Sequence, residues 1–142
     1  MRSWPLALLA VALAAAVLLG GCAGGRSSAP AGRIVHVSER DFRITAPRTL
    51  PPGPVRLIVH NRGPDTHELL VVRLLDPRLP LRGDGLTVNE DAIAPETVGN
   101  LEPGQPGATR ELDVSLKPGT YELFCNMSGH FMGGMHTLIT VG

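Results

Sequence analysis

The sequence lacks any excess of positive charge and has almost no lysine. Its 142 residues carry 13 basic and 13 acidic side chains, so the formal net charge is zero. Lys117 is the only lysine, and no run of basic residues could follow a phosphate backbone. We therefore expect no nucleic acid among the partners of this protein.

Cysteine is also scarce, and the first of the two cysteines belongs to a processing signal. Cys22 ends an apolar segment that follows Arg2 and is too short for an ordinary membrane span. Positive charge, apolar run, small residues and cysteine occur in the order typical of a bacterial lipobox, in which the cysteine is lipidated. We expect residues 1–21 to be a signal peptide with a lipobox and Cys22 to carry lipid. A plain signal peptide with an incidental cysteine is the alternative.

The segment that follows has almost no apolar side chains to bury. Residues 22–32 read CAGGRSSAPAG and are expected to form a flexible tether. Residues 33–142 then form one small domain. The sequence thus predicts an exported, monomeric protein, lipid-anchored to the cell membrane and facing the periplasm or the extracellular side.

No long segment of the domain has the 3.6-residue period of a helix, and short alternating segments rich in β-formers take its place. Seven segments are predicted to be strands: 33–37, 41–44, 55–61, 67–74, 109–116, 121–125 and 137–141. Proline and glycine turns separate them, which predicts an all-β, antiparallel Greek-key β-sandwich. Residues 76–107 contain five prolines and are expected to form one long irregular insertion with a short helix near residues 88–93.

The second cysteine has no evident disulfide partner. If Cys22 carries lipid, Cys125 is a lone thiol in an oxidising compartment. It could be a buried apolar cysteine. It could also pair with His130 as nucleophile and base, although no third group nearby in sequence would orient that base.

Metal binding is the explanation that also accounts for the surrounding residues. The candidate ligands are His67, Cys125, His130 and Met135. Two imidazoles, a thiolate and a thioether suit copper, because trigonal His₂Cys with a weak axial Met is the blue-copper arrangement, whereas zinc rarely uses Met. Met127 and Met132 are rivals of Met135, but we expect them to line the loop surface. His36 and His60 are expected to be ordinary strand histidines.

His67 together with C-x4-H-x4-M at residues 125–135 resembles the cupredoxin superfamily of plastocyanin/azurin-like blue copper proteins. The spacing is nearest the sulfocyanin and rusticyanin type, and the resemblance covers about residues 33–142. It implies one mononuclear type 1 copper ion held by the four candidate ligands, with electrons passing through the exposed edge of His130.

Two positions depart from the pattern of that superfamily. Many members have asparagine after the first histidine, where it ties the two ligand segments together, but this chain has Glu68. Many have proline before the Gly-His of the loop, but this chain has Ser128. Neither change removes a ligand. By alternation from His67, the side chain of Glu68 is expected to point to solvent.

The sequence therefore favours a membrane-tethered carrier of single electrons. Redox partner proteins would dock near His130, where Met127, Phe131 and Met132 form an apolar rim. A copper-binding module for delivery, storage or sensing is the alternative, because the extra methionines suit Cu(I). An enzyme is not expected, because the His-x-His pairs of multicopper enzymes are absent from the sequence.

Overall fold

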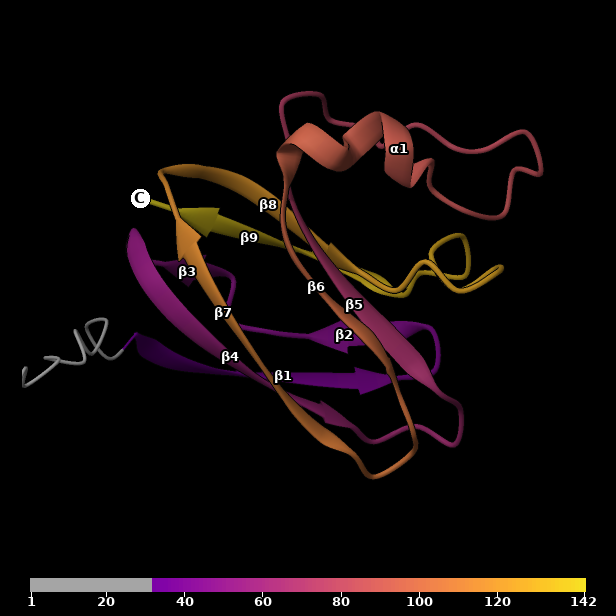
Figure 1. Ribbon diagram of the computed structural model, residues 1–142, viewed down its shortest axis with the longest axis horizontal. Helices are drawn as coiled ribbons and strands as arrows, with labels where there is room; N and C mark the ends of the chain where they lie inside the picture. Colours follow the sequence, from indigo (N-terminus) through magenta and orange to yellow (C-terminus); the bar gives the residue numbers. More distant parts are fainter. Residues whose placement is uncertain (1–31) are drawn as a thin grey trace, which may run out of the picture.

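The computed structural model describes residues 32–142, which form two β-sheets packed face to face (Figure 1). The predicted signal peptide, the lipidation site at Cys22 and all but the last residue of the tether lie outside the described residues. Within residues 32–142, no helix combines the length and the apolar character that crossing a membrane requires.

Nine strands make up the two sheets. The four-stranded sheet has the order β2-β1-β4-β7, with β1 at Arg33–Arg40, β2 at Arg43–Thr45, β4 at Gly53–Asn61 and β7 at Thr109–Leu116. The five-stranded sheet has the order β3-β9-β8-β5-β6, with β3 at Thr49–Leu50, β9 at His136–Val141, β8 at Gly119–Phe124, β5 at His67–Arg73 and β6 at Thr97–Gly104. The prediction of an all-β sandwich is confirmed.

Strand direction differs from the expectation at two places. β1 runs parallel to β4, and β3 runs parallel to β9, whereas the other neighbours are antiparallel. Side chains alternate between faces in the same way in both kinds of pairing. The alternation of the sequence therefore identifies the strands without fixing their direction.

The interval 76–107 is not a single irregular insertion, because its last part is strand β6. This edge strand pairs with β5 in an irregular register. Its sequence, TVGNLEPG, contains two glycines and a proline, which are weak strand formers that edge strands tolerate. The expected short helix is present as α1 (Glu90–Ile93), capped by Asn89 and followed by the 3₁₀ helix η1 (Ala94–Glu96).

The five-stranded sheet is covered on both faces. Its inner face packs on the four-stranded sheet in the main core, to which Leu69 and Val71 contribute. On its outer face, Leu70 and Val72 pack in a second cluster with Val88 and Ile93 from the segment that carries α1. Burial on both faces explains why β5 is a continuous apolar run rather than an alternating one.

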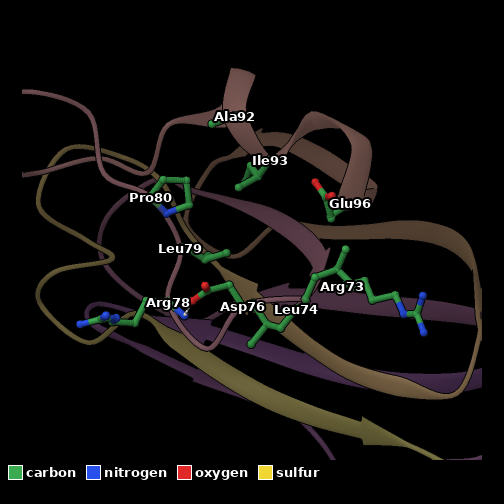
Figure 2. Close-up of a pocket in the computed structure, with 10 residues that line it drawn as sticks. Arg73, Leu74, Asp76, Arg78, Leu79, Pro80, Ala92, Ile93 and Glu96 are labelled. Carbon is green, nitrogen blue, oxygen red and sulfur yellow. Dashed lines mark hydrogen bonds between the residues drawn. The ribbon is translucent and has the colours of Figure 1, made fainter.

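Figure 2 shows how the α1 segment lies over the end of β5. Leu79 and Ile93 are among the side chains that line a small cleft of about 190 Å³ between this segment and the sheet. None of the four candidate metal ligands lines this cleft. Figure 1 shows that β1 begins, and the chain ends, at one end of the sandwich, whereas the loop between β8 and β9 lies at the other.

A buried ion pair joins the two strands β1 and β7. Glu39 is fully buried, and Arg110 donates a hydrogen bond to its carboxylate. Burial raises the pKa of Glu39 to about 7, because loss of hydration outweighs the attraction of Arg110. Within residues 32–142, the second carboxylate oxygen, Oε1, has no hydrogen-bond partner, which is consistent with a costly negative charge.

Replacing Glu39 should change how stability depends on pH. A carboxyl group whose pKa is raised on folding stabilises the fold below its unfolded pKa of 4.5, and this contribution is lost as pH rises through 7. Relative to Glu39→Gln, the wild type should lose roughly 3 kcal/mol of unfolding free energy over this range, as measured by urea titration. Glu111→Gln, at an exposed site on β7, is the control. A difference between wild type and Glu39→Gln that stays constant with pH would contradict the assigned pKa.

Candidate metal centre

Three of the four predicted ligands meet at one end of the sandwich. One donor atom from each of His67, Cys125 and His130 lies within 4.8 Å of the other two. Cys125 Sγ is 3.5 Å from His130 Nδ1, and the rings of His67 and His130 meet edge to face with centroids 5.2 Å apart. Donors that share one ion, each bonded at about 2.0–2.3 Å, have similar separations.

Strand pairing explains why these residues meet. β5 and β8 are antiparallel neighbours, so the beginning of β5 lies beside the end of β8. His67 is the first residue of β5, and Cys125 follows the last residue of β8. His130 then returns over the same end in a tight loop, in which Gly129 and Gly134 adopt φ angles of 80° and 101° that favour glycine.

Met135 is buried directly beside this group. Its carbonyl oxygen accepts the N–H of Cys125 at 3.1 Å, and its own N–H donates to the carbonyl oxygen of His130 at 2.9 Å. The side chain of Met135 is fully buried, whereas Met132 is 54% exposed. Met135 is therefore the methionine of the loop that the structure places inside the molecule. Ligation by its sulfur stays a prediction.

The orientation of His67 fits a metal ligand. Its Nε2 lies 3.0 Å from Oδ1 of Asp41, so Nε2 carries the proton and donates it to the carboxylate. The other ring nitrogen, Nδ1, is buried and has no hydrogen-bond partner among the described residues. Buried polar atoms are almost always paired. A lone pair fixed on Nδ1 by a carboxylate at Nε2 is the usual arrangement of a metal-binding histidine.

Burial shifts the pKa values of two candidate ligands in opposite directions, and only one of the shifts favours metal binding. It lowers the pKa of His67, which favours the neutral imidazole that binds metals. Burial also raises the pKa of Cys125, which disfavours the thiolate. The backbone N–H groups of Met127 and Glu68 near the sulfur lower the pKa of Cys125 and partly offset this effect. A bound cation would complete the stabilisation of the thiolate.

Glu68 is half-buried, whereas its alternation with His67 suggested a side chain that points to solvent. Burial, followed by repulsion from Glu90, raises the pKa of Glu68, and the nearby backbone N–H of Asn126 partly opposes this rise. The carboxylate of Glu68, on the strand that carries His67, therefore lies close to the residue after Cys125.

The turn between β1 and β2 belongs to the site, although nothing in the sequence indicated this. It supplies Asp41 and also Phe42, whose ring meets that of His130 edge to face with centroids 5.6 Å apart. Phe42 is 54% exposed and has a φ of 58°, which is strained for a residue with a side chain. Such strain is concentrated at functional sites. His36 and His60, by contrast, hydrogen-bond to each other at 3.3 Å and belong to no such donor group.

No family model and no curated protein matches the sequence. Several solved structures share its fold. Auracyanin from Roseiflexus castenholzii has a TM-score of 0.58 at 16% identity, over 80% of this chain and 99% of that one. Auracyanin A, described as a blue copper protein from Chloroflexus aurantiacus, has a TM-score of 0.57 at 14% identity, over 77% and 98%.

Rusticyanin from Thiobacillus ferrooxidans has a TM-score of 0.57 at 20% identity, over 79% of each chain. At identities this low, the likeness shows the fold alone. The chain thus has the cupredoxin fold, as the ligand spacing suggested.

Removing the carboxylate that orients His67 should weaken metal binding. In Asp41→Ala the imidazole loses the partner of Nε2, and the copper affinity should fall about 10- to 100-fold, as measured by competition with a chelator. Asp65→Ala is the matched control, because it removes an exposed carboxylate two residues before His67 but leaves the hydrogen bond to Nε2 in place. Equal affinities for Asp41→Ala and the wild type would show that Asp41 does not orient a ligand.

Proposed function

We propose that this protein is a type 1 copper protein that carries single electrons between redox partners in the cell envelope, held at a membrane by lipid on Cys22. The convergence of His67, Cys125 and His130, with the buried Nδ1 of His67 unpaired, carries this proposal. The cupredoxin fold supports it, and so does the donor set, which suits copper among the common metals.

Copper would supply a centre that alternates between Cu(I) and Cu(II), and the protein would hold its ligands still. His67, Cys125, His130 and Met135 would bind the ion. The side chains of His67, Cys125 and Met135 are fully buried, so water has little access to that side of the site. Asp41 fixes one imidazole, and the backbone bonds of Met135 join it to Cys125 and His130. Ligands held in this way need little rearrangement when one electron is gained or lost.

Electrons would enter and leave beside His130. This residue is half-buried, and its ring contacts the exposed ring of Phe42. Phe42 and Met132, each 54% exposed, together with the half-buried Met127, give this end of the molecule an apolar surface. Redox partners would dock there through the small interfaces that suit brief electron-transfer encounters. Phe131 contributes less than expected, because it also packs against Phe124.

The proposed anchor is compatible with docking at this surface. β1 begins at the end of the sandwich opposite the ligand loop (Figure 1). A chain attached through residues that precede β1 would therefore leave the surface around His130 accessible to partners. Catalysis is not part of the proposal, because the sequence has none of the His-x-His pairs that multicopper enzymes use.

Copper delivery or storage is a second candidate function, favoured by the exposed thioether of Met132 next to the ligand loop. Exposed thioethers suit Cu(I). An electron carrier should retain its metal through repeated reduction and oxidation. A delivery protein should instead lose copper to a metal-free acceptor once it is reduced.

The copper-loaded wild type should show an intense visible absorption band from charge transfer between the Cys125 thiolate and Cu(II). Cys125→Ser should lose this band, because an alkoxide or hydroxyl oxygen does not replace the soft sulfur donor. Met132→Leu should retain it. Copper-loaded wild type without such a band would overturn the proposed function.

Met135→Leu should keep copper and raise the reduction potential, measured by voltammetry. With one ligand fewer, less electron density reaches the metal, and Cu(II), the more electron-poor state, is destabilised more than Cu(I). Met132→Leu makes the same chemical change at an exposed site and should leave the potential unchanged. If the reduction potential shifts in Met132→Leu but not in Met135→Leu, the axial ligand is Met132 and the assignment to Met135 is wrong.

A further inference from the structure

The segment between β5 and β6, residues 74–96, is attached directly to the ligand loop. Its attachment point is Asn126, the residue after Cys125. Asn126 Oδ1 accepts the N–H of Val88 at 2.6 Å, and Asn126 Nδ2 donates to the carbonyl oxygen of Val88 at 3.0 Å. Nδ2 also lies 2.7 Å from Oε1 of Glu90. The Asn126 side chain is only 6% exposed, so its two bonds to Val88 are made away from bulk water.

The chemistry of the amide explains this pairing. A carboxamide offers one acceptor and two donors, so it can bond both polar groups of a peptide unit at once. Asn126 thus pairs with Val88 as a neighbouring strand would, and its remaining N–H reaches Glu90. Val88 is completely buried, so its backbone groups would be unpaired without Asn126.

Two further contacts hold the ligand loop against the same segment. Gly129, which precedes His130, donates its N–H to the carbonyl oxygen of Leu86 at 3.3 Å. Phe131, which follows His130, packs against the outer cluster and meets Phe124 with ring centroids 5.3 Å apart. The segment therefore contacts the chain on both sides of His130 as well as immediately after Cys125.

The segment is itself firmly seated on the sheet. Val88 and Ile93 are buried against Leu70 and Val72 of β5. Figure 2 shows Ile93 and Leu79, which belongs to the same cluster, near each other over the sheet. A bridge between Leu81 and Val88 closes the loop between them. The segment can thus transmit the rigidity of the five-stranded sheet to the ligand loop.

On the basis of the proposed function, we propose that residues 74–96 brace the metal-binding loop and that Asn126 is the positioning residue through which the brace acts on Cys125 and His130. The side chain of Asn126 is held by Val88, and the carboxylate of Glu68 on β5 lies near its backbone N–H. The residue after the thiol thereby meets two independent elements. Local opening of the loop would require these buried bonds to break first.

Asn126→Ala tests the brace, with Asn100→Ala as the matched control on the exposed edge strand β6. The first readout is amide hydrogen exchange of the metal-free protein. Exchange at residues 126–134 should become faster in Asn126→Ala and stay unchanged in Asn100→Ala. The second readout is copper affinity, which should fall about 10- to 100-fold in Asn126→Ala, as for other residues that orient metal ligands.

A destabilised core variant separates positioning from general loss of stability. Val114→Ala lowers stability from the main core, where Val114 pairs with Val55 beside the start of β1, at the end of the sandwich opposite the loop (Figure 1). It should accelerate exchange broadly without changing copper affinity. If Asn126→Ala behaves like Val114→Ala, or like the wild type, the brace is refuted. If Asn126→Ala does not fold, Glu90→Ala removes one bond from an exposed residue and should produce a smaller change of the same kind.

Failure of the proposed function is distinguishable from failure of this inference. A wild type that binds copper without the intense visible band would refute the proposed electron carrier. The amide exchange experiment uses metal-free protein, so it would still test whether residues 74–96 brace the loop. If the copper-loaded wild type shows the visible band, but Asn126→Ala has unchanged amide exchange at residues 126–134 and unchanged copper affinity, the brace is refuted and the proposed function is not.

Discussion

The antiparallel pairing of β5 with β8 is the constraint on which the site depends. It brings the start of one strand beside the end of the other, so that His67 lies next to Cys125 although 57 intervening residues separate them in the sequence. The tight loop then adds His130 and Met135 from the same side. Each strand is fixed by the main core on one face and by the outer cluster on the other.

Burial fixes the side chains of His67 and Cys125, but it also removes the water that would hydrate their polar atoms. In the part of the chain that the structure describes, His67 Nδ1 has no hydrogen-bond partner, and loss of hydration disfavours the Cys125 thiolate. One cation bound between them would satisfy both groups, because it would accept the imidazole lone pair and stabilise the thiolate. The carboxylate of Asp41 orients His67 for this role, and backbone N–H groups near the sulfur favour its thiolate form.

The sequence predicted the parts of this arrangement that depend on local pattern. Alternating β-formers identified seven strands, and the close spacing of Cys125, His130 and Met135 identified the ligand loop. β6 was missed because its glycines and proline give no strand signal, although pairing with β5 holds it in place. Asp41 and the role of Asn126 were missed because their partners are distant in sequence. Alternation placed Glu68 in solvent, but its side chain is half-buried and its carboxylate lies near the backbone N–H of Asn126.

X-ray absorption spectroscopy at the copper edge tests the central claim most directly, because it reports the atoms bonded to the metal in the intact protein. The account predicts one sulfur and two imidazole nitrogens bonded to copper at about 2.0–2.3 Å. A spectrum with only nitrogen and oxygen neighbours would contradict it.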